Sequence, residues 1–167
     1  MKHRVVITGM GVVAPNAVGL DNFLEAIQQG RSGITFHQKL QDLKFSCCIG
    51  GIPPVSEEIK NKYLTPLQLR GFDSAGILYG CIAGMDAWKD AGFVIDKNSP
   101  IDYNSGMVFG TGTSGIEKFR EAIYKLDNQK VKRLGSTVVV QTMASGISAY
   151  LGGILGMGNQ VTTNSSA

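Results

Sequence analysis

The chain carries no charged side chain between Leu134 and Ala167. A stretch of this kind either enters a membrane or lies in the core of a protein. Its apolar centre, residues 143–158, is about 16 residues long and rich in Gly and Ser, which is short of the ~20 residues that span a bilayer. The stretch therefore predicts a buried helix, and we expect no membrane among the partners of this chain.

Short apolar runs alternate with segments of helical periodicity along the chain. Residues 5–8, residues 105–110 and the β-branched run in residues 159–167 predict strands. Helices are predicted from Asp21, which can cap the first of them, to Gly30, and then over residues 66–91, 116–126 and 143–158. Residues 31–65 show no long period and predict a surface excursion of loops and short elements. This alternation indicates an α/β fold with a mostly parallel sheet.

Length and composition narrow the function classes. The 167 residues suffice for one domain, and 43% hydrophobic against 17% charged residues excludes disorder. A net charge of +3 without a basic run argues against nucleic-acid binding. Cys47, Cys48 and Cys81 show no metal-ligand spacing, so we expect no metal and a reduced cytoplasmic compartment.

Two glycine-rich strings resemble phosphate-binding loops, GMGVVA at residues 9–14 and GTGTSG at residues 110–115. The first fits G-x-G-x-x-G/A, but Pro15 delays the following helix, and no acidic residue stands where a ribose ligand would be expected. The second string follows a predicted strand, where glycines allow the backbone to pass close to a pocket. A nucleotide-binding module is therefore the weakest of the functions considered.

The nucleophile and base candidates are poor. Cys81 lies on the apolar stripe of residues 66–91, which predicts a buried and inert thiol. Cys47 and Cys48 are adjacent, so in an extended segment their side chains point in opposite directions. Neither His3 nor His37 has a carboxylate at a spacing that suggests a proton relay. The residues alone contain no catalytic constellation.

Four blocks of the sequence, in order, resemble the β-ketoacyl-[acyl-carrier-protein] synthases, the condensing enzymes of fatty-acid and polyketide synthesis. They are RVVITGMGVVAPNAVGLDNFLEAIQQGRSGI at the start, QLRGFDSAGILYGCIAGMDAWKDAGF, SGMVFGTGTSGIEKF, and VVVQTMASGISAYLGGILGMGNQVTTNSSA at the end. The resemblance covers almost the whole chain. It implies an α/β, thiolase-like fold of layers αβαβα, of which residues 1–167 are the N-terminal half only.

The resemblance also implies a reaction. In that family a decarboxylative Claisen condensation joins an acyl group to malonyl-ACP through an acyl-cysteine intermediate. The cysteine would follow directly after Ala167, and two histidines and a lysine would come later still, so no catalytic residue lies in this chain. Substrates would arrive on the phosphopantetheine arm of acyl carrier protein, with no other cofactor. The family works as a homodimer, or as a heterodimer with a related subunit.

Particular residues acquire expected roles from the same resemblance. Thr113 and Met143 would line the acyl channel, and Val138 and Val139 would reach toward the channel of the partner subunit. The dimer interface would contain an antiparallel pairing of one strand with its symmetry mate, formed by Gln160, Val161, Thr162, Thr163, Asn164 and Ser165. One alternative stays open, a catalytically silent partner of the chain-length-factor type, in which another residue would replace the cysteine.

Overall fold

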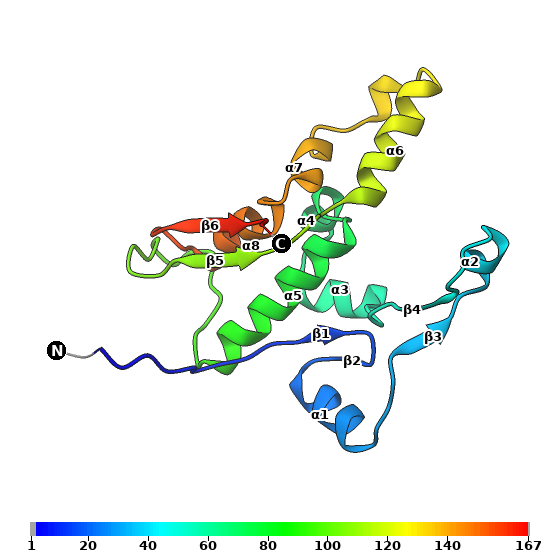
Figure 1. Cartoon of the computed structure of the whole chain (residues 1–167). Helices are drawn as coiled ribbons and strands as arrows, with labels where there is room; N and C mark the ends of the chain where they lie inside the picture. Colours follow the sequence, from blue (N-terminus) through cyan, green and yellow to red (C-terminus); the bar gives the residue numbers. More distant parts are fainter. Residues whose placement is uncertain (1–2, 167) are drawn as a thin grey trace.

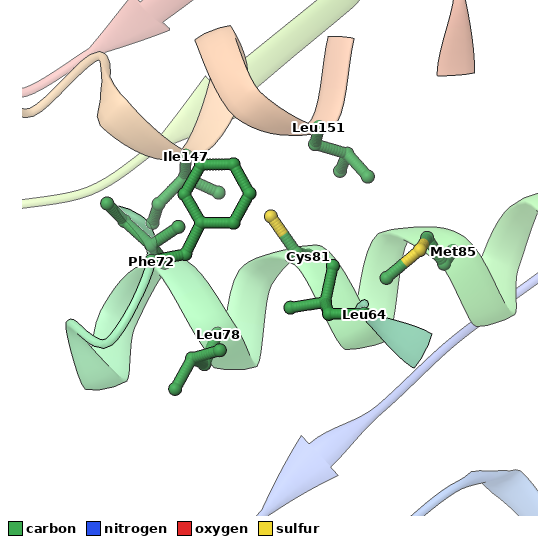
Figure 2. Close-up of a cluster of buried hydrophobic side chains, with 8 residues drawn as sticks. Leu64, Phe72, Leu78, Cys81, Met85, Ile147 and Leu151 are labelled. Atoms are coloured by element: carbon green, nitrogen blue, oxygen red, sulfur yellow. The ribbon is translucent and has the colours of Figure 1, made fainter. Parts of the chain in front are cut away.

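Two helices, α5 (Ala75–Asp90) and α8 (Gly146–Leu155), pack against each other at the centre of the computed structural model, which describes residues 3–166 (Figure 1). Gly80 and Gly84 of α5 allow this contact, because a Cβ on Gly80 would lie 2.5 Å from Ile147 and one on Gly84 would overlap Leu151. Figure 2 shows the resulting cluster of buried side chains, with the sulfur of Cys81 directed toward α8. The cluster comprises Leu64, Phe72, Ile77, Leu78, Cys81, Met85, Ile147 and Leu151.

The helix predicted over residues 66–91 is two helices, so that prediction is wrong in its continuity. Helix α4 (Pro66–Gly71) begins with a capping box, in which the Thr65 hydroxyl accepts from the Gln68 N–H and the Gln68 side chain accepts from the Thr65 N–H. The chain then leaves helical geometry at Phe72 (φ −133°, ψ 65°), and α5 starts at Ala75. Between the two helices, the backbone N–H groups of Asp73 and Ser74 donate to the side-chain oxygen of Gln141, which lies far along the chain.

Strands β5 (Met107–Gly110) and β6 (Val161–Asn164) form a parallel pair in which Met107 lies opposite Val161 and Gly110 opposite Asn164. The connection between them runs through α6 (Ile116–Asp127), the 3₁₀ turn η1 (Val131–Arg133), α7 (Val138–Thr142) and α8. Helix α8 packs on both strands. Both predicted strands and the parallel direction of their pairing are confirmed.

The other strand pairs are antiparallel hairpins, which the expectation of a mostly parallel sheet did not include. Strand β1 (Val13–Ala14) pairs with β2 (Ala17–Val18), and β3 (Ile34–Phe36) pairs with β4 (Ile49–Gly51). Strands β1 and β2 are joined by a turn of two residues, 15–16, which permits only the antiparallel direction. The longer segment of residues 37–48 joins β3 to β4.

The N-terminal segment is extended but forms no strand at residues 5–8, so this prediction is wrong. Val5 is 94% exposed and Ile7 is 85% exposed, because no described strand lies alongside to pair with them. Helix α1 (Leu20–Gln28) follows β2, and its N-cap is Gly19, not Asp21. Gly19 has a φ of 85°, and Asp21 lies inside the first turn of the helix. There its carboxylate interacts favourably with the positive end of the helix dipole, but it does not cap the helix. The helix ends before Gly30, as predicted.

Residues 31–52 form an arm that projects from the body of the molecule (Figure 1). It contains β3, α2 (Gln38–Asp42) and β4, and α3 (Glu57–Tyr63) follows it, which confirms the expected excursion of short elements. The His37 ring hydrogen-bonds the Gly50 carbonyl oxygen at 3.0 Å and so joins the two sides of the arm. The arm exposes the apolar side chains of Ile34, Phe36, Leu43, Phe45, Ile49 and Ile52.

The uncharged C-terminal stretch supplies α7, α8 and β6. Ile147 and Leu151 of α8 are buried, which confirms a core helix within residues 143–158. Among residues 3–166, no helix combines the length and the apolar character that crossing a membrane requires.

Candidate functional site

At the carboxyl end of the β5–β6 pair, the glycine-rich loop of residues 110–115 lies next to the end of the uncharged C-terminal stretch. Sites in open α/β sheets lie at the carboxyl ends of parallel strands, where the following loops converge. Here the Thr111 N–H, the first after β5, donates to the Asn164 carbonyl oxygen at 3.0 Å. The glycine-rich loop of residues 110–115 and the last described residues therefore begin at the same edge.

Strand β6 is fixed in place through its polar side chains. The Ser148 hydroxyl donates to the Ser145 carbonyl oxygen at 3.1 Å, so the Thr163 hydroxyl, 2.6 Å away, donates to Ser148 Oγ. Beyond the strand, Asn164 Oδ1 accepts from the N–H and the hydroxyl of Ser166, at 2.8 and 2.6 Å. These bonds hold β6 on α8 and direct the chain after it.

The glycine-rich loop turns sharply into α6. Gly115 has a φ of 65°, and a Cβ there would overlap the carbonyl oxygen of Gln141, so no other residue fits. Nothing lies within 4 Å of the Cβ positions of Gly110 and Gly112. Gly115 thus brings the loop into close backbone contact with α7, and the passage of this loop beside a pocket stays a prediction.

Gln141 of α7 is 3% exposed and connects three helices. Its side-chain oxygen accepts from the N–H groups of Asp73 and Ser74, at 3.1 and 3.0 Å. These two backbone donors lie at the break between α4 and α5, and Gln141 supplies their hydrogen-bond acceptor. Its amide donates to Thr137 Oγ1 at 3.3 Å. Sequence reasoning missed this residue, although its signal was present as the single amide within the apolar run VVVQT.

A second polar contact joins α6 to the same junction. Glu117 Oε1 accepts from the Ala75 N–H at 2.8 Å, and Lys118 forms ion pairs with Asp73 and Glu121. Burial alone would lower the pKa of Lys118, but its hydrogen bonds to Asp73 and Glu121 outweigh this effect and raise that pKa. The loop, α6 and α7 are therefore anchored as a unit to the start of α5.

The structure places the four residues with expected channel roles around this unit. Val138 and Val139 lie on α7, Met143 is its C-cap residue, and Thr113 stands in the glycine-rich loop. Val139 is 67% exposed and Met143 is 48% exposed. Contact between loop and α7 at Gly115 brings these residues to one region, but their roles in lining a channel stay a prediction.

The segment expected at a dimer interface, residues 160–165, contains all of β6. One edge of β6 pairs with β5, and among residues 3–166 no strand pairs with its other edge. The pairing with a symmetry mate stays a prediction.

The first glycine string serves helix packing. A Cβ on Gly11 would overlap the Ala83 carbonyl oxygen, and one on Gly9 would lie 2.8 Å from Ala91 Cβ, so both glycines let the chain approach α5 closely. The Met10 N–H also donates to Asp90 at 2.8 Å. The close contact with α5 thus accounts for both glycines of this string.

The cysteines within the described residues offer no activated nucleophile at this edge. Cys81 is fully buried, and burial raises the pKa of its thiol to about 12. The Cys47 and Cys48 thiols donate to different carbonyl oxygens, those of Ile49 and Phe45. In residues 3–166 no group of three or more potential ligands could hold a metal ion.

Comparison with known proteins identifies what this arrangement is similar to. The family model described as Beta-ketoacyl synthase, N-terminal domain, matches residues 2–167. A chloroplastic 3-oxoacyl-[acyl-carrier-protein] synthase I of Arabidopsis thaliana is 28% identical and covers 97% of this chain. The 3-oxoacyl-[acyl-carrier-protein] synthase 1 of Escherichia coli K12 is 30% identical and covers 89% of it. This chain spans 34% and 36% of the lengths of these two relatives.

Solved structures show the same fold. The ishigamide ketosynthase/chain length factor superposes with a TM-score of 0.75 at 19% identity, over 95% of this chain and 38% of the other. A type II polyketide ketosynthase, solved in complex with its acyl-carrier protein, superposes with a TM-score of 0.73 at 20% identity, over 98% of this chain and 38% of the other. The α/β class and the thiolase-like fold expected from the sequence are confirmed.

Proposed function

The chain belongs to the β-ketoacyl synthase family, and we propose that it is the first part of a 3-oxoacyl-[acyl-carrier-protein] synthase. The observation that carries the proposal is the carboxyl end of the β5–β6 pair. There the strand resembling the one that leads to the family's cysteine ends beside the glycine-rich loop, joined to it by the Thr111–Asn164 hydrogen bond.

The proposed reaction is a decarboxylative Claisen condensation. A cysteine thiolate, expected directly after Ala167, attacks the carbonyl carbon of an acyl thioester, and the phosphopantetheine thiol leaves with a proton. Malonyl thioester then loses carbon dioxide, and the resulting carbanion attacks the acyl-cysteine to form the new carbon–carbon bond while the cysteine thiolate departs. Covalent catalysis of this kind divides one difficult step into two easier ones.

The residues of this chain would position the reacting groups and shape the substrate channel. The Ser148–Thr163 hydrogen bond holds β6 against α8, so the residue that follows the strand would be held at a fixed place. Thr113 and Met143 would line the acyl channel, and Val138 and Val139 would reach toward the partner's channel. Gly115 and Gln141 would keep that loop and α7 in contact.

The proposed synthase would work with acyl carrier protein and with a second subunit. Acyl carrier protein would deliver the substrates on its phosphopantetheine arm, without a further cofactor, in the cytoplasm. Residues 160–165 would pair antiparallel with the same strand of a second subunit, identical or related. The free edge of β6 among the described residues supports this interface, since an unpaired strand edge is usually covered in proteins.

The first test is the intact mass of the natural polypeptide, followed by fragment sequencing of the peptide that contains Thr162 to Ala167. We expect a mass more than twice 17.8 kDa and a cysteine after Ala167. With such a polypeptide, incubation with acyl-ACP should add one acyl mass to that peptide, and replacement of the cysteine by alanine should abolish the adduct. Glutamine or another residue at that position would instead indicate the silent, chain-length-factor type.

The channel assignment has its own test in the same enzyme. Replacing Met143 by Trp should slow the elongation of long acyl chains more than that of short ones, because a larger side chain would shorten the channel. The matched control is Met10→Trp, since Met10 is also exposed but lies on the N-terminal segment. Equal slowing of all chain lengths by Met143→Trp would contradict the assignment.

A further inference from the structure

A groove separate from the β5–β6 edge lies between α3, α4, the end of α5 and α8. Its volume of about 1060 Å³ is close to the upper end of the ~300–1,000 Å³ range of small-molecule sites. Leu64, Phe72 and Met85 are buried at its floor. Tyr150 and Ile154 of α8 are half-buried along it. The surface inside the groove is thus predominantly apolar.

Three lysines surround this apolar floor. Lys62, Lys89 and Lys97 are all exposed and line the groove, and none of them forms an ion pair within residues 3–166. The ammonium groups of Lys89 and Lys62 lie 5.0 and 5.7 Å from the centre of the Tyr63 ring, which gathers two positive charges at one end.

The nearby carboxylates are engaged elsewhere. Asp86 accepts the hydrogen bond of the Tyr63 hydroxyl at 3.0 Å. Asp96, the one acidic residue among those that line the groove, accepts from the Asn98 N–H at 2.9 Å and from the Ser99 hydroxyl at 3.5 Å. The residues that line the groove therefore carry a net positive charge, three lysines against one aspartate, and Asp86 adds one carboxylate beside Tyr63 without lining the groove.

We propose that this groove binds a single-chain anionic amphiphile, a medium- or long-chain fatty carboxylate, with its hydrocarbon on the floor and its carboxylate at Lys62 and Lys89. Burial of the chain supplies most of the affinity, since apolar burial contributes in proportion to area. The unpaired ammonium groups select a negative head group. This site takes part in no step of the proposed condensation and stands independently of it.

Gly153 provides a direct way to block the groove. It lies on α8 and lines the groove, its φ is not in the left-handed region, and nothing lies within 4 Å of the position of a Cβ. Gly153→Phe therefore fills the groove without a clash at Cβ, and Gly153→Ala is the matched control that leaves it open. Ala149→Phe, one helical turn earlier on the same groove wall, is a second blocking variant that guards against misfolding of the first.

The experiment is titration calorimetry of the full natural polypeptide with sodium dodecanoate below its critical micelle concentration. We expect saturable binding that Gly153→Ala retains and Gly153→Phe and Ala149→Phe abolish. The double variant Lys62→Gln, Lys89→Gln should weaken binding about two- to thirtyfold, since it removes two exposed charge pairs with the carboxylate. Lys39→Gln on the arm, outside the groove, should have no effect.

Three results would overturn the proposal. Unchanged binding in both blocking variants, with their thermal melting intact, would place dodecanoate elsewhere. Equal binding of dodecanol or dodecyltrimethylammonium would remove the selection for a carboxylate. Binding of phosphatidylglycerol vesicles that depends on the lysines but not on Gly153 would indicate adsorption to a membrane surface instead of a groove ligand.

Discussion

Helices α5 and α6 both carry an apolar stripe, yet only the stripe of α5 is buried. Ile77 and Cys81 of α5 are fully buried against α8, whereas Ile116 and Leu126 of α6 are 61% and 58% exposed. The two helices differ in whether another helix packs on their apolar face. Small residues on α5 admit α8, while among residues 3–166 the apolar face of α6 has no comparable neighbour (Figure 1). An amphipathic pattern thus predicts a helix and a face that favours burial, but not what covers it.

The largest expected change in stability follows from replacing one leucine on each side of this comparison by alanine. Leu151→Ala in the core should lower the free energy of unfolding by about 2–5 kcal/mol, because it removes buried methyl groups and leaves a cavity. Leu126→Ala on α6 should change it by less than about 0.5 kcal/mol, since that side chain is mostly exposed. Urea denaturation of both variants beside the parent chain measures the difference.

A large cost of Leu126→Ala would break the comparison. It would mean that α6 is covered in the natural protein, by another part of the polypeptide or by a second subunit. Dilution separates these two cases, because only coverage by a second subunit makes the stability depend on protein concentration.

The N-terminal segment contains the same contrast within a few residues. Val5 and Ile7 are exposed, whereas Gly9 and Gly11 lie directly on α5. Gly11→Ala should destabilise the fold by about 1–3 kcal/mol, because its Cβ would meet backbone that cannot move aside as a side chain would. Gly112→Ala, with open space around the new Cβ, is the matched control and should be nearly neutral. Equal thermal melting of the two variants would show that the segment does not depend on α5.

The local elements were largely predictable from the sequence, and their partners were not. The periodicity of α6 and α8 and the runs at β5 and β6 gave helices and strands close to the observed bounds. These signals depend on neighbours within a few residues. Residues 5–8 have the apolar composition of a strand buried on both faces, but a strand needs a hydrogen-bonding neighbour, and none is present among the described residues.

The candidate site was predictable only in outline. The glycine-rich loop and the end of β6 could be singled out by resemblance, and the structure joins them through Thr111 and Asn164. Gln141 could not be predicted to act on Asp73 and Ser74, because the contact spans 68 and 67 residues. The break between α4 and α5 depends on that distant side chain, so local propensity alone suggested one continuous helix.

The smallest of these effects compares the thiol in the core with those on the arm, through pH. Burial raises the pKa of Cys81 from about 9 to about 12, so between these values the unfolded chain has lost a proton that the folded chain retains. The free energy of unfolding should therefore fall by about 1 kcal/mol between pH 9 and pH 10, and by at most about 1.4 kcal/mol for each further pH unit. Urea denaturation at pH 9 and pH 10 tests this window. Near pH 10 the unfolded tyrosines begin to ionise, so Tyr63 and Tyr150, whose pKa values burial also raises, add a smaller loss, and the comparison between cysteine variants isolates the part due to Cys81. Cys81→Ala should remove this dependence, whereas Cys47→Ala on the exposed arm should keep it. The same slope in both variants would show that the Cys81 thiol reaches solvent, and that the core around α5 and α8 is no better shielded than the arm.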